Sequence, residues 1–409
     1  MPPPARAHQT RDTAARTDEF NAAAEAYFAR LKEYEYLLHK PYSDPFQFSR
    51  YLFNVGVLSH YLRVGPGDRV VEVGAGTCWV SHFLNRFGCR TVSIDVSLSA
   101  LALGRDLFRR DGHTRWDLRP TFLPYDGHRL PLADASCDRI IIHDAYHHFP
   151  NPQELLGEMV RILRPQGIVA MSEPGREHSA SEDSQREVEY AQVLENDVII
   201  EDVDTAARAA GFTRVTLVPV VLEAPEVPAG DLEAFLHGKG FTEHWACQAT
   251  QLLGHQFILL YKGEPRQTTR GKGRHRARLE PLGVPQPGIL RAIPGAEIAL
   301  TCRVHNVGES TWLAGPGRFP GEALLGVRLR PAATDTQLQD WARGLIPREM
   351  SPGEEAHIDL RFPAPDHPGR YQLVLDMVAE SLCWFGDQGS EVAELTLEVG
   401  SLDTDPGLG

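Results

Sequence analysis

The sequence lacks any long apolar run. Stretches such as Ile140–Ile142 and Val198–Ile200 are far shorter than the ~20 apolar residues that a membrane-spanning helix needs. The first residues, Met1–Arg6, also lack the apolar segment of a secretory signal. We therefore expect a protein without a membrane span that stays in the cytoplasm.

Cysteines and positive charges are both scarce. The six cysteines among 409 residues are scattered without C-x-x-C spacing, which argues against a zinc knuckle or a redox pair. We expect reduced thiols and no metal site, and we do not favour the alternative of a bridge between Cys302 and Cys383. Lys and Arg number 41 against 55 Asp and Glu, and the net charge of −14 disfavours nucleic acid as a partner.

A basic stretch is the exception to this acidic balance, and it divides the chain. Residues 264–283 carry no apolar pattern, which indicates a solvated linker. A patch for nucleic acid or anionic lipid is the alternative, but the basic residues from Arg266 to Arg278 have no accompanying aromatics. The expected parts around this linker are a disordered segment at 1–18, helices forming a lid at 19–65, an α/β domain at 66–263, a β-domain at 284–400 and a tail at 401–409.

Residues 66–263 alternate between short β-branched runs and helical patterns. The strand-like runs lie at 69–73, 91–95, 138–142 and 167–172, and the helical stretches lie at 77–87, 97–110 and 152–163. This rhythm predicts a parallel, doubly wound α/β sheet. Residues 214–222 and 255–262 are expected as two closing strands, joined by a helix over 229–253.

A strand runs into a glycine turn and then a helix at Val70–Trp79. Glycines let the backbone turn tightly and approach a ligand, while helix N–H groups point into the site. Asp95 ends the next strand about 20 residues on, where an acid accepts hydrogen bonds from ribose hydroxyls. Trp79 stands where a dinucleotide fingerprint needs a small residue, so the pattern favours a ligand without pyrophosphate over NAD.

Several motifs in this order resemble the class I, Rossmann-like S-adenosylmethionine (SAM)-dependent methyltransferases of the type 11-like group. The resemblance covers about 66–265 and runs through Val70–Thr77, Ser93–Val96, Tyr125–Gly127, Cys137–Pro150 and Glu154–Ile168. It implies a seven-stranded sheet with the last strand antiparallel. It also implies SAM as the cofactor and S-adenosylhomocysteine as the product.

The resemblance assigns a role to each cofactor-binding position. Glu72, Gly74, Ala75 and Gly76 would shape the methionine side of the pocket, Asp95 would bind the ribose, Val96 would flank the adenine, Asp126 with Gly127 would meet the adenine edge, and His143 would contact the cofactor. Cys78 departs from the pattern, because the family often has a third glycine there. A small thiol should be tolerated at that position, where it would tighten the pocket.

Candidate catalytic groups follow the fourth and fifth strands, because ligands bind at the carboxyl ends of parallel strands. Methyl transfer to a hydroxyl requires alignment of the nucleophile and removal of its proton, and histidine titrates near neutrality. We expect His147, His148 or Glu173 as the base, with only one of the two histidines facing the cleft. Positioning without a base, and a histidine that only caps the next helix, are the alternatives.

Acceptor binding is expected from Tyr42, Asp144 and Glu173. The polar, acidic segment 179–197 would join residues 40–42 as a lid over the acceptor, or it is simply a solvated helix.

Residues after 284 alternate strictly between apolar and polar. The alternating runs lie at 297–305, 357–362, 371–377 and 392–399, which predicts a β-sandwich of roughly 110 residues. The motifs at Asn306–Trp312, Ser351–Glu355 and Pro368–Asp376 resemble an Ig-like sandwich, a module appended to bacterial enzymes that act on cell-surface polysaccharides. The aromatics Trp312, Trp384 and Phe385 would either stack on sugars or, as we favour, fill the core.

Three hypotheses about function follow. The first is O-methylation of a sugar or glycan-related acceptor. The second is methylation of a small natural product or quinone, with the sandwich as an interaction or dimerisation module of a homo-oligomer. The third is a non-catalytic SAM-binding protein, against which the histidine pair and Glu173 argue.

Overall fold

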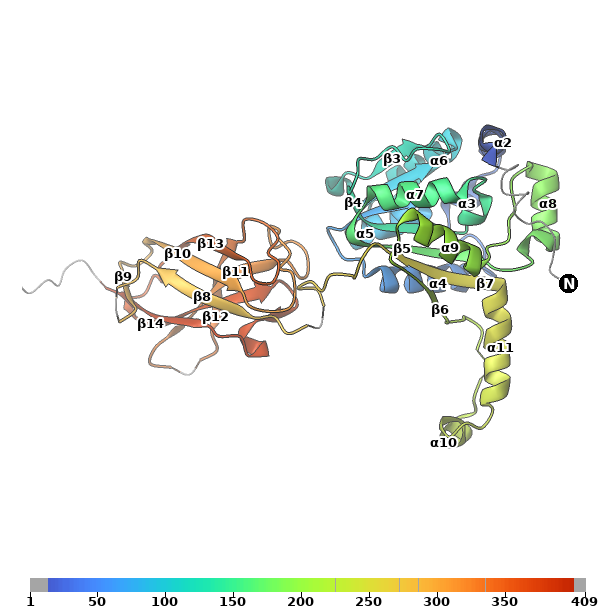
Figure 1. The fold of residues 1–409 in the computed structure, drawn as a ribbon. Coiled ribbons are helices and arrows are strands. Elements are labelled where there is room, and N and C mark those ends of the chain that lie inside the picture. Colours follow the sequence, from blue (N-terminus) through green and yellow to red (C-terminus); the bar gives the residue numbers. More distant parts are fainter. Residues whose placement is uncertain (1–13, 225, 272, 286, 335, 401–409) are drawn as a thin grey trace, which may run out of the picture. The chain divides into compact units, whose positions relative to one another are not determined.

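The computed structural model of the protein describes residues 14–400, apart from 225, 272, 286 and 335 (Figure 1). The chain divides between Pro265 and Arg266 into two compact units, each with its own core. The expected disorder at 1–13 and the expected tail at 401–409 lie outside the described residues. Within the expected disordered segment, the first helix already begins at Thr17.

The first unit is built on a seven-stranded sheet in the order β3-β2-β1-β4-β5-β7-β6. Its strands are β1 (Arg69–Val73), β2 (Arg90–Asp95), β3 (Thr121–Pro124), β4 (Cys137–His143), β5 (Leu163–Pro174), β6 (Arg214–Val218) and β7 (His255–Tyr261). β7 pairs antiparallel with both β5 and β6, whereas the other pairs are parallel. The expected doubly wound, Rossmann-like sheet with an antiparallel last strand is confirmed.

Helices cover both faces of this sheet. The helices of this unit are α2 (Thr17–Arg30), α3 (Glu35–Leu38), α4 (Phe48–Leu62), α5 (Trp79–Phe87), α6 (Leu98–Arg110), α7 (Pro152–Ile162), α8 (Glu182–Ala191), α9 (Ile200–Ala210), α10 (Leu232–Leu236) and α11 (Phe241–Gly254). Successive strand residues point to opposite faces, so Ile140 and Ile142 pack in one core with α7 and α9, while Ile141 packs in the other with α4 and α5. The central strands are apolar on both faces for this reason.

The helix expected over 229–253 is broken. Gly238 and Gly240 adopt φ of +97° and +82°, which ends α10 and starts α11. These left-handed conformations favour glycine and cannot continue a right-handed helix. Figure 1 shows α10 and α11 projecting from the sheet of the first unit.

The second unit is an all-β sandwich. One sheet has the order β13-β10-β8 and the other β12-β11-β14-β16-β9, with β15 beside β14. The strands are β8 (Ala277–Leu282), β9 (Ile289–Ala292), β10 (Glu297–Asn306), β11 (Ala323–Pro331), β12 (Gln339–Leu345), β13 (Glu355–Pro363), β14 (Gly369–Ala379), β15 (Cys383–Trp384) and β16 (Ala393–Val399). Inward-facing residues of both sheets share one core, which confirms the expected sandwich.

The expected linker at 264–283 is mostly part of this sandwich. Its last residues form β8, which pairs antiparallel with β10, and Thr268 bridges Thr311. Basic side chains of the stretch contact the same unit, since Arg266 lies 2.7 Å from Glu349 and Arg276 donates to the carbonyl of Gln388. The alternation of β8 is weak because its inward positions are Ala277, Leu279 and Pro281, of which only Leu279 is a large apolar residue.

Each of the six cysteines is a free thiol, Cys302 and Cys383 included. Across the described residues, no helix combines the length and the apolar character needed to cross a membrane.

Candidate functional site

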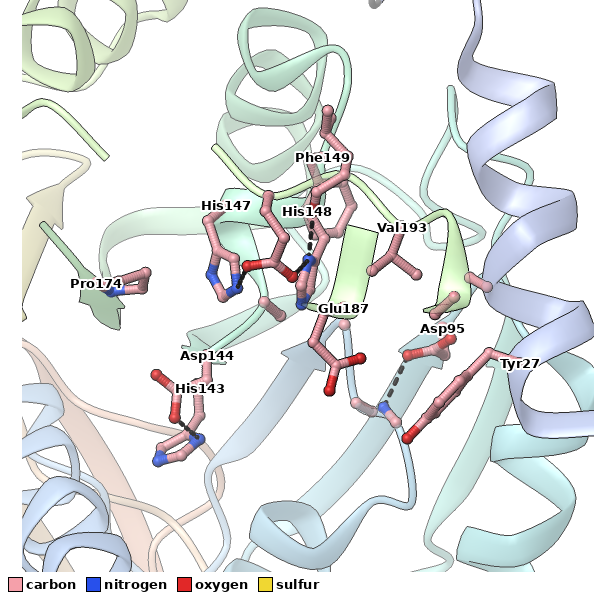
Figure 2. Close-up of a pocket in the computed structure, with 18 of the residues that line it drawn as sticks. Tyr27, Asp95, His143, Asp144, His147, His148, Phe149, Pro174, Glu187 and Val193 are labelled. Carbon is pink, nitrogen blue, oxygen red and sulfur yellow. Dashed lines mark hydrogen bonds and ion pairs between the residues drawn. The ribbon is translucent and has the colours of Figure 1, made fainter. Parts of the chain in front are cut away.

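A pocket of about 800 Å³ lies at the carboxyl ends of β1, β2, β4 and β5. Residues of α2, α4 and α8 and the segment 193–195 complete its walls. Figure 2 shows Tyr27 and Asp95 at one side of this pocket and His143 and Asp144 at the other. We call Glu72, Gly74, Ala75, Gly76, Asp95, Val96 and Tyr125 the loop half. We call Lys40, Arg50, His143, Asp144, His147, His148, His178, Glu187 and Glu195 the histidine half.

The glycine turn of the loop half needs its glycines. Gly74 and Gly76 adopt φ of +71° and +50°, and a Cβ added at Gly74 would lie 2.5 Å from the Cβ of Ala145. Beneath the turn, the buried Glu72 carboxylate accepts a hydrogen bond of 2.8 Å from the Ser81 N–H of α5. Burial raises the pKa of Glu72 to about 8. Glu72 therefore ties β1 to α5, and the bare backbone is left to face the pocket.

Asp95 lies where a ribose-binding acid is expected. Its carboxylate accepts hydrogen bonds from the backbone N–H groups of Gly76 (2.7 Å) and Ser97 (2.8 Å). Burial raises its pKa. A carboxylate has about four lone-pair positions, so acceptor capacity remains for hydroxyl groups. Val96 and Tyr125 line the pocket beside it, as expected for the adenine side.

Cys78, in place of the family's third glycine, is accommodated by a glycine of the next helix. Cys78 is buried in the left-handed conformation, with φ of +60°. A Cβ at Gly104 of α6 would lie 2.4 Å from the Cys78 Sγ. Burial raises the pKa of the Cys78 thiol, so the group is uncharged near neutral pH. The thiol fills space that the missing side chain at 104 provides.

Asp126 and Gly127 do not reach the pocket wall. Asp126 Oδ1 accepts from the N–H groups of His128 (2.8 Å) and Arg129 (2.7 Å), which closes its own turn and lowers the pKa of Asp126. Helix α2 covers this turn, because Asn21 donates to the Asp126 carbonyl at 3.1 Å. Phe20, Asn21, Ala24, Tyr27 and Phe28 of α2 line the pocket on this side. The expected contact of Asp126 and Gly127 with an adenine edge stays a prediction.

His143 and Asp144 lie at the end of β4. The His143 ring packs edge-on against Trp79 at 5.3 Å, and its Nδ1 lies 3.5 Å from Asp144 Oδ2. Burial alone would raise the pKa of Asp144, but His143, His255 and Arg50 hold it below its usual value. Both residues line the pocket, with Asp144 as a carboxylate.

Glu173 is fully buried and does not line the pocket. Its Oε1 accepts from the N–H groups of Ala145 (3.0 Å) and Tyr146 (2.9 Å), and its Oε2 lies 2.8 Å from His147 Nδ1. The N–H of His147 also donates to Oε2, at 3.3 Å, so four donors surround the carboxylate. This arrangement favours Glu173 as a positioning group over the expected roles of base and acceptor contact, which stay predictions.

The two adjacent histidines both line the pocket, in different states. Because the Glu173 carboxylate only accepts, His147 Nδ1 donates to it and Nε2 faces Glu195 at 3.8 Å. Burial opposes the charged form of His147, yet Glu173 and Glu195 raise its pKa. His148 Nδ1 donates to the Leu194 carbonyl at 2.6 Å. Burial, then the neighbouring His147, lowers the pKa of His148.

His148 therefore has the features of a base. Its bonded Nδ1 leaves the lone pair on Nε2, and among the described residues that nitrogen has no hydrogen-bond partner. The side chain is 41% exposed within the pocket, against 7% for His147. A lowered pKa keeps the ring neutral at neutral pH, which a general base needs.

Tyr42 is 69% exposed and does not line the pocket, and its expected acceptor contact stays a prediction. Lys40 lines the pocket instead, with its Nζ 5.4 Å from the centre of the Tyr51 ring. Burial lowers the pKa of Lys40. The peptide bond between Lys40 and Pro41 is cis.

Helix α8 covers the pocket with one face. Asp183, Glu187 and Ala191 line the cavity, while Tyr190 is 81% exposed. Figure 2 shows the Glu187 carboxylate directed into the cavity. Of the two interpretations of segment 179–197, the arrangement favours the lid.

Sequence reasoning missed His178 and Glu195. His178 Nε2 lies 2.7 Å from Glu195 Oε2, and Glu195 also approaches His147 and His148. Both residues lie in the insertion after β5, which carries no motif. The acidic bias of that insertion was the available signal, but it does not distinguish these two residues from their neighbours.

Comparisons with known proteins match the part of the chain that forms the loop half. Residues 71–171 match the methyltransferase domain family. Methyltransferase GfsG of Streptomyces halstedii is 34% identical over 113 residues, which are 27% of this chain and 40% of that protein. A demethylmenaquinone methyltransferase of Renibacterium salmoninarum is 34% identical over 108 residues, 26% of this chain and 42% of that protein. The chain thus spans less than half the length of these relatives.

A solved structure gives a weaker likeness. Haemonchus contortus phosphoethanolamine N-methyltransferase 2, in complex with SAM, is 20% identical with a TM-score of 0.38, and the match covers 63% of this chain and 60% of that chain.

The resemblance to SAM-dependent methyltransferases is confirmed over the matched segment, and SAM is the cofactor of this domain. The structure fits that group. A Cβ added at Gly74 would clash with Ala145, so glycine keeps the turn open where the cofactor would bind. Asp95 has acceptor capacity for ribose hydroxyls. The match ends at residue 171, before the lid and the residues His178 and Glu195.

Proposed function

We propose that this chain catalyses SAM-dependent O-methylation of a small, polar acceptor, with a sugar hydroxyl as the candidate nucleophile. The observation that carries the proposal is His148, a neutral imidazole with an available Nε2 in the same pocket as the glycine turn. When bound, SAM supplies a methyl group activated by a positive sulfonium. The chain must then align a hydroxyl and take up its proton.

The residues divide this work between them. The backbone at Gly74–Gly76 and the Asp95 carboxylate would hold the cofactor. Glu173 fixes the turn at 145–147 through backbone hydrogen bonds and thereby orients both histidines. His148 Nε2 would take the hydroxyl proton. Helices α2 and α8 both line the pocket and would limit the access of water to it.

The polarity of the histidine half supports a polar acceptor. Its walls carry Lys40, Arg50, Asp144, Glu187 and Glu195, which would be costly to bury against an apolar ring and its tail. The name of the Renibacterium relative, a demethylmenaquinone methyltransferase, supports the quinone hypothesis, but the similarity covers only 26% of this chain. Hydroxyl groups would satisfy these side chains, so a sugar is the favoured acceptor.

The sandwich supports sugar binding less than the pocket does. Trp312 and Phe385 are 0% exposed and belong to the core. The guanidinium carbons of Arg328 and Arg343 lie 4.3 Å and 4.7 Å from the centre of the Trp384 ring, so arginines already contact this aromatic side chain. We therefore assign acceptor recognition to the pocket and keep the sandwich as an interaction or dimerisation module.

The test is turnover with labelled SAM against a panel of sugars, phenols and demethylated quinones. Sugar turnover with little quinone turnover supports the proposal. Transfer to quinones alone would refute the polar acceptor, and no transfer to any class would favour a SAM-binding protein without catalysis.

The base is tested with His148→Ala, which should lower kcat about 100-fold or more while SAM binding by calorimetry is unchanged. His113→Ala is the matched control, because its side chain is 80% exposed outside the pocket. Turnover of His148→Ala within a few-fold of the control would remove His148 from the mechanism.

A further inference from the structure

The histidine half contains a group of side chains with the composition of a metal site. His147, His178 and Glu195 each offer one ligand atom, and these atoms lie within 4.8 Å of one another. The Nε2 atoms of His178 and His147 lie 2.7 Å and 3.8 Å from Glu195 Oε2. Two imidazoles and one carboxylate are a ligand set that catalytic zinc sites use.

The spacing suits a small cation. Metal–ligand bonds of about 2.0–2.1 Å place the ligand atoms of a tetrahedral site roughly 3.3 Å apart. The two distances to Glu195 Oε2, 2.7 Å and 3.8 Å, fall on either side of that value.

Other groups already orient the candidate ligands. Glu173 Oε2 accepts from His147 Nδ1 at 2.8 Å, which fixes the tautomer and leaves the Nε2 lone pair for a cation. This carboxylate–histidine pair is the arrangement that supports metal-binding histidines elsewhere. Glu195 is held at 5% exposure, so its carboxylate is not a solvated surface group.

The surrounding charge favours a cation. Glu187, from the lid, and Asp144 line the same pocket as Glu195, which also holds Lys40 and Arg50. A divalent ion would pair with these carboxylates.

We propose that His147, His178 and Glu195 bind a divalent transition-metal cation, with Zn²⁺ as the first candidate. Three protein ligands leave a fourth position open to the pocket, and an acceptor hydroxyl would bind there. That catalytic part rests on the proposed O-methylation.

The metal would lower the pKa of the bound hydroxyl, whose proton passes to His148 Nε2. The new O–CH₃ bond then forms as the S–CH₃ bond of SAM breaks, and both electrons of that bond stay on the neutral sulfur of S-adenosylhomocysteine. No oxidant or further reactant is needed.

Metal binding is measured on the full chain after chelator treatment and dialysis. Co²⁺ is followed by its visible absorption and Zn²⁺ by calorimetry. We expect one equivalent of either ion to bind to the wild-type protein and to His113→Ala, the exposed-histidine control. His178→Ala and Glu195→Gln should weaken binding about 100-fold or more.

Glu195→Gln keeps the size of the side chain, so it preserves the test if His178→Ala does not fold; SAM binding reports an intact pocket in both. Absence of Co²⁺ absorption and Zn²⁺ heat in the wild-type protein would overturn the site. So would binding that both pocket variants retain, because the ion would then lie elsewhere.

Activity separates this inference from the proposed function. Metal binding without transfer to any acceptor would refute the proposed function but not the metal site. Full transfer by the metal-free protein, unchanged in His178→Ala, would refute the catalytic role of the metal but not the proposed O-methylation.

Discussion

The two halves of the pocket are built in different ways. The loop half comes, apart from Tyr125, from one continuous segment, residues 70–96, and presents mainly backbone to its ligand. The histidine half gathers side chains from α4, the end of β4 and the insertion after β5. Backbone geometry serves one ligand shape, whereas gathered side chains are free to vary. The comparison explains why the cofactor is much better determined than the acceptor.

The largest effect should come from changing the backbone of the loop half. Gly74→Val places a Cβ 2.5 Å from Ala145 at a φ of +71°, so SAM binding should weaken about 100-fold or more. Calorimetry measures the affinity. Gly157→Ala is the control, because nothing lies within 4 Å of its added Cβ, and it should bind SAM normally. Normal affinity in Gly74→Val would mean that SAM does not bind at the turn.

A smaller effect is expected from the group that orients the histidine half. Glu173→Gln brings an amide N–H toward backbone donors at 145–147, so kcat should fall roughly 10- to 100-fold. SAM affinity should change little, since Glu173 does not line the pocket. A larger loss of SAM affinity than of kcat would break the division between the halves.

The pH profile gives a finer test of the same half. Because His148 has a lowered pKa, kcat should rise with pH through a value below 6.5, the ordinary pKa of histidine, and level off by neutral pH. His147→Asn removes the neighbouring imidazole, which contributes to the lowered pKa of His148, and keeps a donor for Glu173. The pKa of His148 should then rise, and the acid limb of the profile should move to higher pH. An unmoved limb would assign the titration to another group.

The smallest effect on activity is expected in the sandwich. Burial raises the pKa of Asp376 from 3.8 to about 6 despite the nearby Arg328. Because its pKa is higher in the folded state, Asp376 stays protonated there to a higher pH than in the unfolded chain. Its contribution to stability is therefore full below about pH 4, is lost as pH rises to about 6, and is level above that. Asp376→Asn should flatten this contribution, which thermal unfolding measures as a few degrees. Methyl transfer should be unchanged, and a large loss would connect the sandwich to catalysis.

The loop half could be predicted from the sequence because its geometry is local. Glycines after a strand, and Asp95 after the next strand, are sufficient to place the turn. The sheet followed from β-branched runs, but β3 was missed because it is only 4 residues long and ends in Pro124. The sandwich strands with clean alternation were found, whereas β8 was missed because Ala277 and Pro281 stand at two of its three inward positions.

The histidine half could not be predicted to the same depth. The run at 143–148 indicated the histidines, but only contacts made across the fold distinguish His148 from His147. Glu173 follows β5 as expected of a site residue, yet backbone N–H groups occupy its carboxylate. His178 and Glu195 meet only because the insertion folds back over the sheet, and no spacing rule encodes that.

The contact between Cys78 and Gly104 has an evolutionary consequence. A methyl group at 104 meets Cys78 Sγ at 2.4 Å and its Cβ at 2.8 Å. With glycine at 78 instead, the two cysteine contacts would be gone, and the Thr77 carbonyl oxygen at 3.1 Å would remain. The two positions should therefore change together, since a larger residue at 104 becomes accessible only after position 78 has lost its side chain. Relatives that share this cysteine should share the glycine, and the pair would mark their common descent.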